Sequence, residues 1–180
     1  MRMIIVITRP DFFVGEAERI TALLTSGKAD LVHIRKPMAN PHEVEQLLCQ
    51  LPAVLYPRLV VHDCFDLAVR YGLRGVHLNS RHPHPPAGWQ GHVSISCHSL
   101  NELAECRKQP FRYISLSPIF DSISKQGYHS AFTREQIAEA RRQGLIDQRV
   151  MALGGVTFNR INEISEMGFG GAMILGDAWK

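Results

Sequence analysis

The chain has 180 residues, of which 45% are hydrophobic and 21% charged, and its formal net charge is +3. This composition predicts one globular domain spanning residues 1–180, and the mild charge without a Lys/Arg run argues against nucleic acid as a partner. No apolar run approaches the roughly 18 residues that cross a bilayer, so we expect no membrane partner either.

The start of the chain and its cysteines predict a cytoplasmic protein. The apolar run near the start, M-I-I-V-I, is too short for a signal peptide and has no cleavage site after it, so it predicts a buried strand. The cysteines form no C-x-x-C pair, which favours free thiols in a reducing compartment. They are Cys49, Cys64, Cys97 and Cys106.

Short apolar runs alternate with amphipathic segments from one end of the chain to the other. The apolar runs predict strands at 3–8, 29–35, 58–62, 74–78, 92–97, 111–117, 149–153 and 170–175. Between them, helical periodicity or capping residues predict helices at 15–26, from Asn40, at 66–71, from Ser99, from Thr133 and at 159–167. The segment 79–91 is rich in His and Pro and predicts a loop.

Eight buried strands with helical crossovers between most of them predict an α/β protein with a parallel sheet. Strands that are apolar throughout suit a sheet covered on both faces, and eight such units favour a closed (β/α)8 TIM barrel over an open doubly wound sheet. Only D-A-W-K and one glycine follow the last predicted strand, so we expect this chain to lack the last helix of the barrel.

In such a barrel the chemistry lies at the carboxyl ends of the strands. The second predicted strand ends in His33, Arg35 and Lys36, and an arginine beside a lysine suits a diphosphate clamp, although a solvated basic strand end is the alternative. The third ends in His62 and Asp63. This aspartate either holds Mg²⁺ that bridges diphosphate oxygens or caps the next helix.

The sixth predicted strand breaks at Pro118 and leads into a loop with two hydroxyls and an ammonium, Ser122, Ser124 and Lys125. These groups suit a phosphate or diphosphate, although a polar surface loop is the alternative. The fifth strand contributes Ser96. Glycines at the ends of the last two strands, among them Gly155 and Gly176, let backbone N–H groups approach a phosphate.

The chain contains seven short motifs, in this order: H-I-R-K, V-V-H-D-x-x-D-L-A, G-V-H-L, S-x-S-C-H-S, S-P-I-F-D-S-x-S-K, A-L-G-G-V and G-F-G-G-A. Together they are similar to motifs of the thiamine phosphate synthase family and of its relative, the thiazole tautomerase. The resemblance covers residues 3–176 and implies a (β/α)8 barrel. It also implies Mg²⁺-assisted joining of hydroxymethylpyrimidine diphosphate to thiazole phosphate, with release of diphosphate.

The resemblance also implies roles for individual residues. Arg35 and Lys125 match diphosphate-binding residues, Ser96 matches a serine beside the pyrimidine, and Asp63 matches the first Mg²⁺ ligand. Thiazole phosphate would be bound by Ser122 and Ser124 together with the backbone at Gly155. We predict that His33, Lys36, His62 and Gly176 also contact the phosphorylated substrates, and a homo-oligomer is left open.

Four departures from the family pattern keep other functions open. His33 and His62 replace a glutamine and an asparagine, the lysine at 36 comes one position early, and His82 stands at the position of a second Mg²⁺ aspartate. A thiazole phosphate tautomerase and a non-catalytic phosphate-binding regulator are the alternatives within the family. A metal-dependent sugar-phosphate epimerase, with a transition metal on His33, His62, His77 and Asp63, is the alternative outside it.

Overall fold

The computed structural model describes residues 2–121 and 131–180 of the chain. Its eight parallel strands follow one another as β1 to β8 in the order of a closed barrel, and helices alternate with most of them. The predicted (β/α)8 fold is therefore confirmed. The chain divides into two compact units, residues 5–93 and residues 94–180 with the first four, so the single domain spanning 1–180 stays a prediction.

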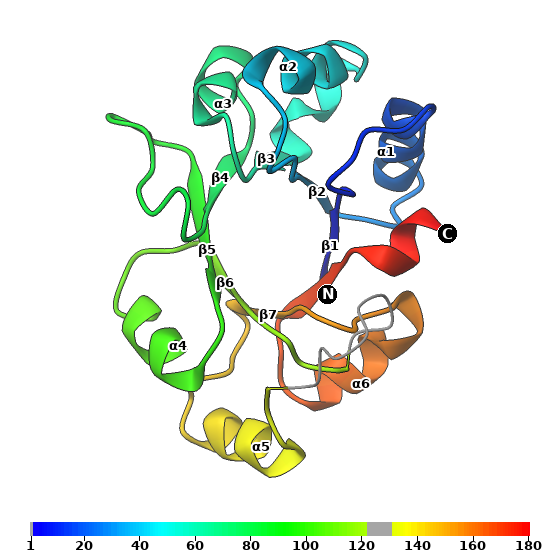
Figure 1. Ribbon diagram of the computed structural model, residues 1–180. Helices are drawn as coiled ribbons and strands as arrows, with labels where there is room; N and C mark the ends of the chain where they lie inside the picture. The colour runs from blue at the N-terminus through cyan, green and yellow to red at the C-terminus, as the bar shows by residue number, and fades with distance from the viewer. Residues whose placement is uncertain (1, 122–130) are drawn as a thin grey trace. The chain divides into compact units, whose positions relative to one another are not determined.

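The first unit is built on the strands β1 to β4. In chain order its elements are β1 (Met3–Ile7), α1 (Glu16–Thr25), β2 (Leu31–Ile34), α2 (Pro41–Cys49), the 3-10 helix η1 (Ala53–Arg58), β3 (Leu59–Val61), α3 (Phe65–Tyr71) and β4 (Gly75–Leu78). Neighbouring strands pair in parallel, with His33 opposite Val60 and Val61 opposite Val76. Figure 1 shows α1, α2 and α3 on the outer side of these strands.

The second unit continues the alternation of strands and helices. Its elements are β5 (His92–Cys97), α4 (Leu100–Cys106), β6 (Tyr113–Leu116), α5 (Arg134–Arg142), β7 (Val150–Ala152), η2 (Phe158–Arg160), α6 (Ile161–Glu166), β8 (Gly171–Ile174) and η3 (Gly176–Trp179). As predicted, 79–91 contains no helix, and only the 3-10 turn η3 follows β8.

The caps read from the sequence begin the helices where expected. The side chain of Asn40 accepts a hydrogen bond from the backbone N–H of Glu43, and the side chain of Glu43 accepts one from the backbone N–H of Asn40, which completes a capping box at the start of α2. Thr133 and Gln136 form the same capping box at the start of α5. Ser99 also accepts from the backbone N–H of Glu102, but the carboxylate of Glu102 binds the backbone N–H of His98 instead. The S-x-x-E pattern of Ser99 and Glu102 therefore forms only half of a capping box at the start of α4.

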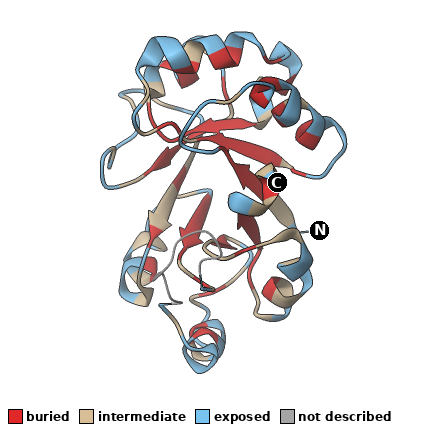
Figure 2. Ribbon diagram, turned by 45° about the vertical axis from the view of Figure 1, so that its right-hand side comes forward, coloured by how far each residue is buried: buried red, intermediate tan, exposed pale blue. Residues whose placement is uncertain are grey.

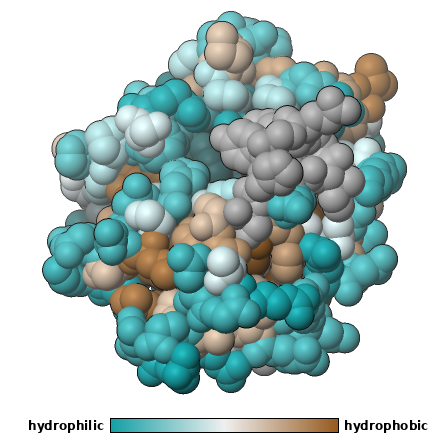
Figure 3. All heavy atoms as spheres, turned by 60° about the horizontal axis from the view of Figure 1, so that its bottom comes forward, coloured by the Kyte–Doolittle hydropathy of each residue, from teal (hydrophilic) through white to brown (hydrophobic). Residues whose placement is uncertain are grey.

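Burial follows the expected pattern in each unit. Six strands are buried throughout, β1 is buried only from Ile5 on, and β5 is mostly half-buried, while the helices are buried on one face and exposed on the other (Figure 2). Hydrophilic side chains predominate on the face drawn in Figure 3, with smaller groups of hydrophobic ones between them, as is usual for protein surfaces. No helix in the described residues is long and apolar enough to cross a membrane.

Candidate active site

Arg35 lies directly after β2 and is held there by its backbone. Its N–H donates to the hydroxyl of Thr8 at 2.9 Å, and the same hydroxyl donates to the Arg35 carbonyl at 3.3 Å. The side chain is half-buried, and no described residue forms a hydrogen bond or ion pair with its guanidinium. Burial lowers the pKa of Arg35, the charge of Arg81 lowers it further, and Asp63 acts in the opposite direction.

Lys36 is directed into a buried ion pair. Its Nζ donates to the two carboxylate oxygens of Glu16 at 2.7 and 2.8 Å and to the Asp11 carbonyl at 2.7 Å, and it lies 4.4 Å from the ring centroid of Phe12. Burial lowers the pKa of Lys36 and raises that of Glu16, while their pairing opposes both shifts. Substrate binding by Lys36 stays a prediction, and it would require this ion pair to open.

Asp63 lies after β3 and faces the loop after β4. Its Oδ1 accepts from Arg81 at 2.9 Å and lies 3.3 Å from Nε2 of His82. Its Oδ2 is buried and has no hydrogen-bond partner among the described residues. No side chain caps α3, so the alternative in which Asp63 is a helix cap is wrong. Asn79 orders this loop by accepting from the backbone of Arg81 at 3.0 Å.

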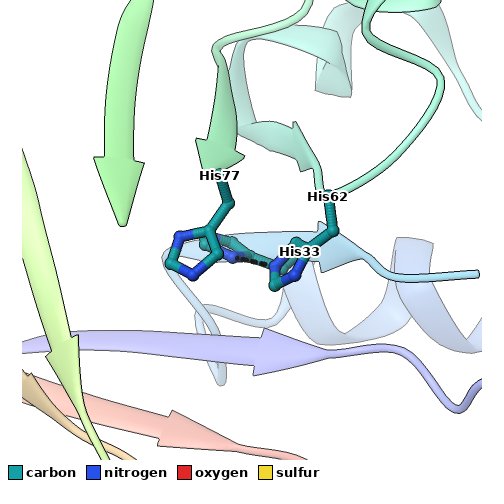
Figure 4. Close-up of side chains that lie close together, drawn as sticks. All are labelled: His33, His62 and His77. Carbon is teal, nitrogen blue, oxygen red and sulfur yellow. Dashed lines mark hydrogen bonds between the residues drawn. The ribbon is translucent and has the colours of Figure 1, made fainter. Parts of the chain in front are cut away.

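The two histidines predicted to bind substrate, His33 and His62, lie in the interior together with His77 (Figure 4). Nδ1 of His33 and Nε2 of His62 are 2.8 Å apart, and the rings of His62 and His77 stack with centroids 4.3 Å apart. Burial lowers the pKa of His77 to about 3 and holds the pKa values of the other two well below the usual 6.5. All three imidazoles are therefore neutral at pH 7.

The second unit holds the other predicted residues. Ser96 on β5 accepts a hydrogen bond from the hydroxyl of Ser115 on β6 at 3.4 Å. At the end of β6 the hydroxyl of Ser117 lies 3.1 Å from Nδ1 of His98. Ser122, Ser124 and Lys125 fall outside the described residues, so their predicted contacts with phosphate stay predictions.

Gly155 follows β7 and packs against the chain that leads out of β6. The N–H of Ile119 donates to the Leu153 carbonyl, and that of Phe120 donates to the Gly154 carbonyl. A Cβ on Gly155 would lie 2.4 Å from the Asp121 carbonyl oxygen, and its φ is +63°. A glycine is therefore needed here for close backbone packing, whether or not a phosphate binds.

Gly176 is exposed and begins η3. The next residue, Asp177, accepts through Oδ2 from the backbone N–H of Phe158, the first residue of η2. One N–H of the loop after β7 is thus already bonded to a carboxylate of the loop after β8. The predicted contacts of Gly155 and Gly176 with a phosphate stay predictions.

Sequence reasoning missed Glu16 and Arg81. Glu16 opens α1 and looks like an ordinary acidic residue of a first helical turn, and only its burial at 2% exposure distinguishes it. Arg81 stands beside His82 in a loop with no periodicity. Its position directly after the fourth strand could have indicated a functional role, because the loops after barrel strands carry the charged residues of the active site.

A family model described as thiamine monophosphate synthase matches residues 4–176. The chain belongs to the thiamine monophosphate synthase family. Among solved structures, thiamine phosphate pyrophosphorylase from Bacteroides thetaiotaomicron is 42% identical, with a TM-score of 0.87 over 99% of this chain and 85% of that one. The enzyme of that name from Pyrococcus furiosus, 20% identical with a TM-score of 0.76 over 96% of this chain and 85% of that one, supports the fold.

Curated members of the thiamine monophosphate synthase family agree. Thiamine-phosphate synthase from Yersinia pestis is 29% identical over 168 residues, which are 87% of this chain and 75% of the relative. The protein of the same name from Koribacter versatilis is 24% identical over 161 residues, 86% of this chain and 75% of the relative. The family resemblance predicted from the motifs is therefore confirmed.

Proposed function

We propose that this member of the thiamine monophosphate synthase family is a thiamine-phosphate synthase, a transferase that joins hydroxymethylpyrimidine diphosphate to thiazole phosphate. The observation that carries the proposal is the 42% identity over 99% of the chain to a thiamine phosphate pyrophosphorylase. The relatives from Yersinia pestis and Koribacter versatilis carry the synthase name, so the tautomerase and the non-catalytic regulator are not favoured.

The reaction breaks the bond between the pyrimidine methylene carbon and the diphosphate oxygen, and the bonding electrons leave with the diphosphate. The thiazole nitrogen then forms a new bond to the methylene carbon. Cations that face the departing oxygen lower the barrier because they stabilise charge as it develops. The guanidinium of Arg35, half-buried and without a described partner, fits this role, and Arg81 adds a second positive charge near it.

The residues around Asp63 fit a Mg²⁺ ion that has one protein ligand. Oδ2 of Asp63 is a buried carboxylate oxygen with no described partner, which is the kind of ligand that Mg²⁺ prefers. Mg²⁺ is commonly held by one or two carboxylates, and substrate phosphates and water complete its shell. Bound there, the ion would neutralise diphosphate charge. His82 supplies no oxygen, and Arg81 already compensates Oδ1, so we expect weak binding of Mg²⁺ without substrate.

Two further features support parts of the proposal. Asp63 pairs with Arg81 and does not lie in the group formed by the three histidines. The epimerase alternative requires all four residues at one metal ion, so this arrangement does not support it.

The four cysteines are free thiols, as is typical of proteins in reducing compartments, and we propose that the enzyme acts in the cytoplasm.

The test is an assay of the full chain with hydroxymethylpyrimidine diphosphate, thiazole phosphate and Mg²⁺, with thiamine phosphate as the measured product. We expect product at a rate that rises with enzyme concentration and falls when Mg²⁺ is removed by a chelator. Binding of thiazole phosphate without any product, from enzyme with a cooperative melting transition, would contradict the synthase and return the regulator as the leading alternative.

A further inference from the structure

Three histidines from three consecutive parts of the first unit converge on one point. His33 lies on β2, His62 directly follows β3, and His77 lies on β4, and Figure 4 shows the three rings turned toward one another. Their ring centroids lie between 4.3 and 5.1 Å apart. Each ring offers one nitrogen, and the three nitrogens lie within 4.8 Å of one another.

The strand register explains this convergence. Val61 pairs with Val76, so the next residues along these parallel strands, His62 and His77, are cross-strand neighbours on the same side of the sheet. His33 joins them from β2, where it faces Val60 of β3. The backbone thus holds the three side chains together before any ligand arrives, which favours a preformed site.

The burial of the cluster is unusual for imidazoles. His33 and His77 are 0% exposed and His62 is 5% exposed. Histidine is less often fully buried than the apolar residues of a core, so three buried imidazoles in contact mark this point as a candidate ligand site. A metal ion binds imidazole through a ring nitrogen in its neutral form.

We propose that His33, His62 and His77 form a binding site for one first-row transition metal ion, with Zn²⁺ as its closest chemical match. Three neutral imidazoles and one open position are a common Zn²⁺ arrangement. Mg²⁺ does not fit, because it requires oxygen ligands and near-octahedral geometry. The site is therefore chemically distinct from the carboxylate of Asp63, and it goes beyond the proposed synthase reaction.

The geometry requires only small side-chain movements on binding. Zn–N bonds of about 2.0–2.1 Å in a tetrahedral site place the nitrogens roughly 3.4 Å apart. The pair formed by His33 and His62 is already closer, at 2.8 Å, and shares a hydrogen bond that the metal would replace. The three nitrogens lie within 4.8 Å of one another, so the cluster is compact enough to converge on one ion with modest side-chain adjustment.

The competing interpretation is a hydrogen-bonded core of neutral histidines that binds nothing. The two are separated by titrating the untagged full chain, stripped by chelator and dialysis, with Co²⁺ and then Zn²⁺, because a polyhistidine tag would bind both ions. We expect one ion per chain, a visible Co²⁺ spectrum of tetrahedral type that Zn²⁺ abolishes, and a higher melting temperature with either ion. Fewer than half an ion per chain at saturation, with an unchanged melting temperature, overturns the proposal.

Matched variants assign the ligands. His77→Gln keeps a polar side chain of similar size, and we expect it to lower Zn²⁺ affinity by more than about 100-fold, since even residues that only support a ligand are worth 10–100-fold. His84→Gln makes the same change in the exposed loop and should leave affinity unchanged. Zn²⁺ affinity within tenfold of wild type in folded His77→Gln overturns the assignment.

X-ray absorption spectroscopy of the Zn²⁺-loaded wild-type protein identifies the zinc ligands without any variant. If His77→Gln fails to fold, the number of imidazole scatterers around zinc decides. Three imidazoles at about 2.0–2.1 Å support the site. One or none places the ion elsewhere on the protein and overturns the proposal.

Discussion

Nζ of Lys36 and the carboxylate of Glu16 form a two-pronged ion pair, with distances of 2.7 and 2.8 Å, whose side chains are 0% and 2% exposed. The pair connects the residues that follow β2 to the first turn of α1. Its burial makes each charge dependent on the other, because a lone ion in this position would lose its hydration without compensation.

Lys36→Met is therefore expected to lower the free energy of unfolding by about 3–5 kcal/mol, because it leaves the carboxylate of Glu16 buried and unpaired. Urea denaturation measures the change. Lys108→Met is the matched control, since Lys108 forms an exposed pair with Glu105 that should contribute at most about 1 kcal/mol. The double variant Glu16→Leu/Lys36→Met should recover much of the loss. An unchanged stability of Lys36→Met with a weakened affinity for the pyrimidine diphosphate would instead support the predicted clamp.

Arg35→Gln should impair transfer and leave stability nearly unchanged, because no described residue bonds the guanidinium. Loss of one charge-assisted hydrogen bond of about 1.5–3 kcal/mol corresponds to a fall of roughly 10- to 100-fold in kcat/KM for the pyrimidine diphosphate. Steady-state kinetics measure it. Arg70→Gln, which removes an exposed arginine on α3, should keep full activity. Equal transfer rates for Arg35→Gln and Arg70→Gln would show that Arg35 does not take part in the reaction.

His82 lies beside Asp63, the proposed Mg²⁺ ligand, so the residue at position 82 is expected to influence the affinity for Mg²⁺. Nε2 of His82 is 3.3 Å from Oδ1 of Asp63, so a shorter carboxylate at this position would provide a second acidic oxygen near the first. We expect His82→Asp to lower the Mg²⁺ concentration for half-maximal activity about tenfold, which corresponds to about 1.4 kcal/mol. His84→Asp adds the same charge at an exposed position two residues on and should change nothing. If both variants keep the wild-type Mg²⁺ dependence, Asp63 is not the metal ligand.

The arrangement of strands could be predicted from the sequence because each strand is a short apolar run bounded by turn residues. The N-terminal caps at Asn40 and Thr133 could be predicted because they depend on residues three apart. Strand ends could be predicted to within a residue: Arg35 and His62 are predicted as the last residues of their strands and directly follow β2 and β3 in the structure. What these residues touch is set by tertiary packing, which no local pattern contains.

Two side chains show why contacts escaped prediction. Lys36 adjoins Arg35 in the sequence, but successive side chains of an extended segment point in opposite directions, and its partner Glu16 lies 20 residues earlier on a helix. His33, His62 and His77 each lie within or at the end of a predicted strand, at 29–35, 58–62 and 74–78. In a sheet covered on both faces, however, alternation does not tell which face a polar residue occupies. Register across three strands was needed to bring them together.

Gly155 combines close packing against the chain after β6 with a left-handed backbone conformation. A Cβ there would lie 2.4 Å from the Asp121 carbonyl oxygen and 2.7 Å from Cβ of Phe120, and the positive φ of +63° adds strain. Gly155→Ala should therefore lower the free energy of unfolding by more than about 1 kcal/mol and displace the start of the segment that leads toward Lys125.

Gly144→Ala is the matched control for Gly155→Ala. Gly144 has a φ of +73° but nothing within 4 Å of the added Cβ, so it reports the strain of the left-handed conformation alone. Thermal denaturation and the transfer assay measure both variants. We expect Gly144→Ala to lose some stability and keep its activity, and Gly155→Ala to lose more stability together with most of its transfer rate. Similar losses in both variants would mean that Gly155 is required only for its backbone conformation and not for its packing against the chain after β6.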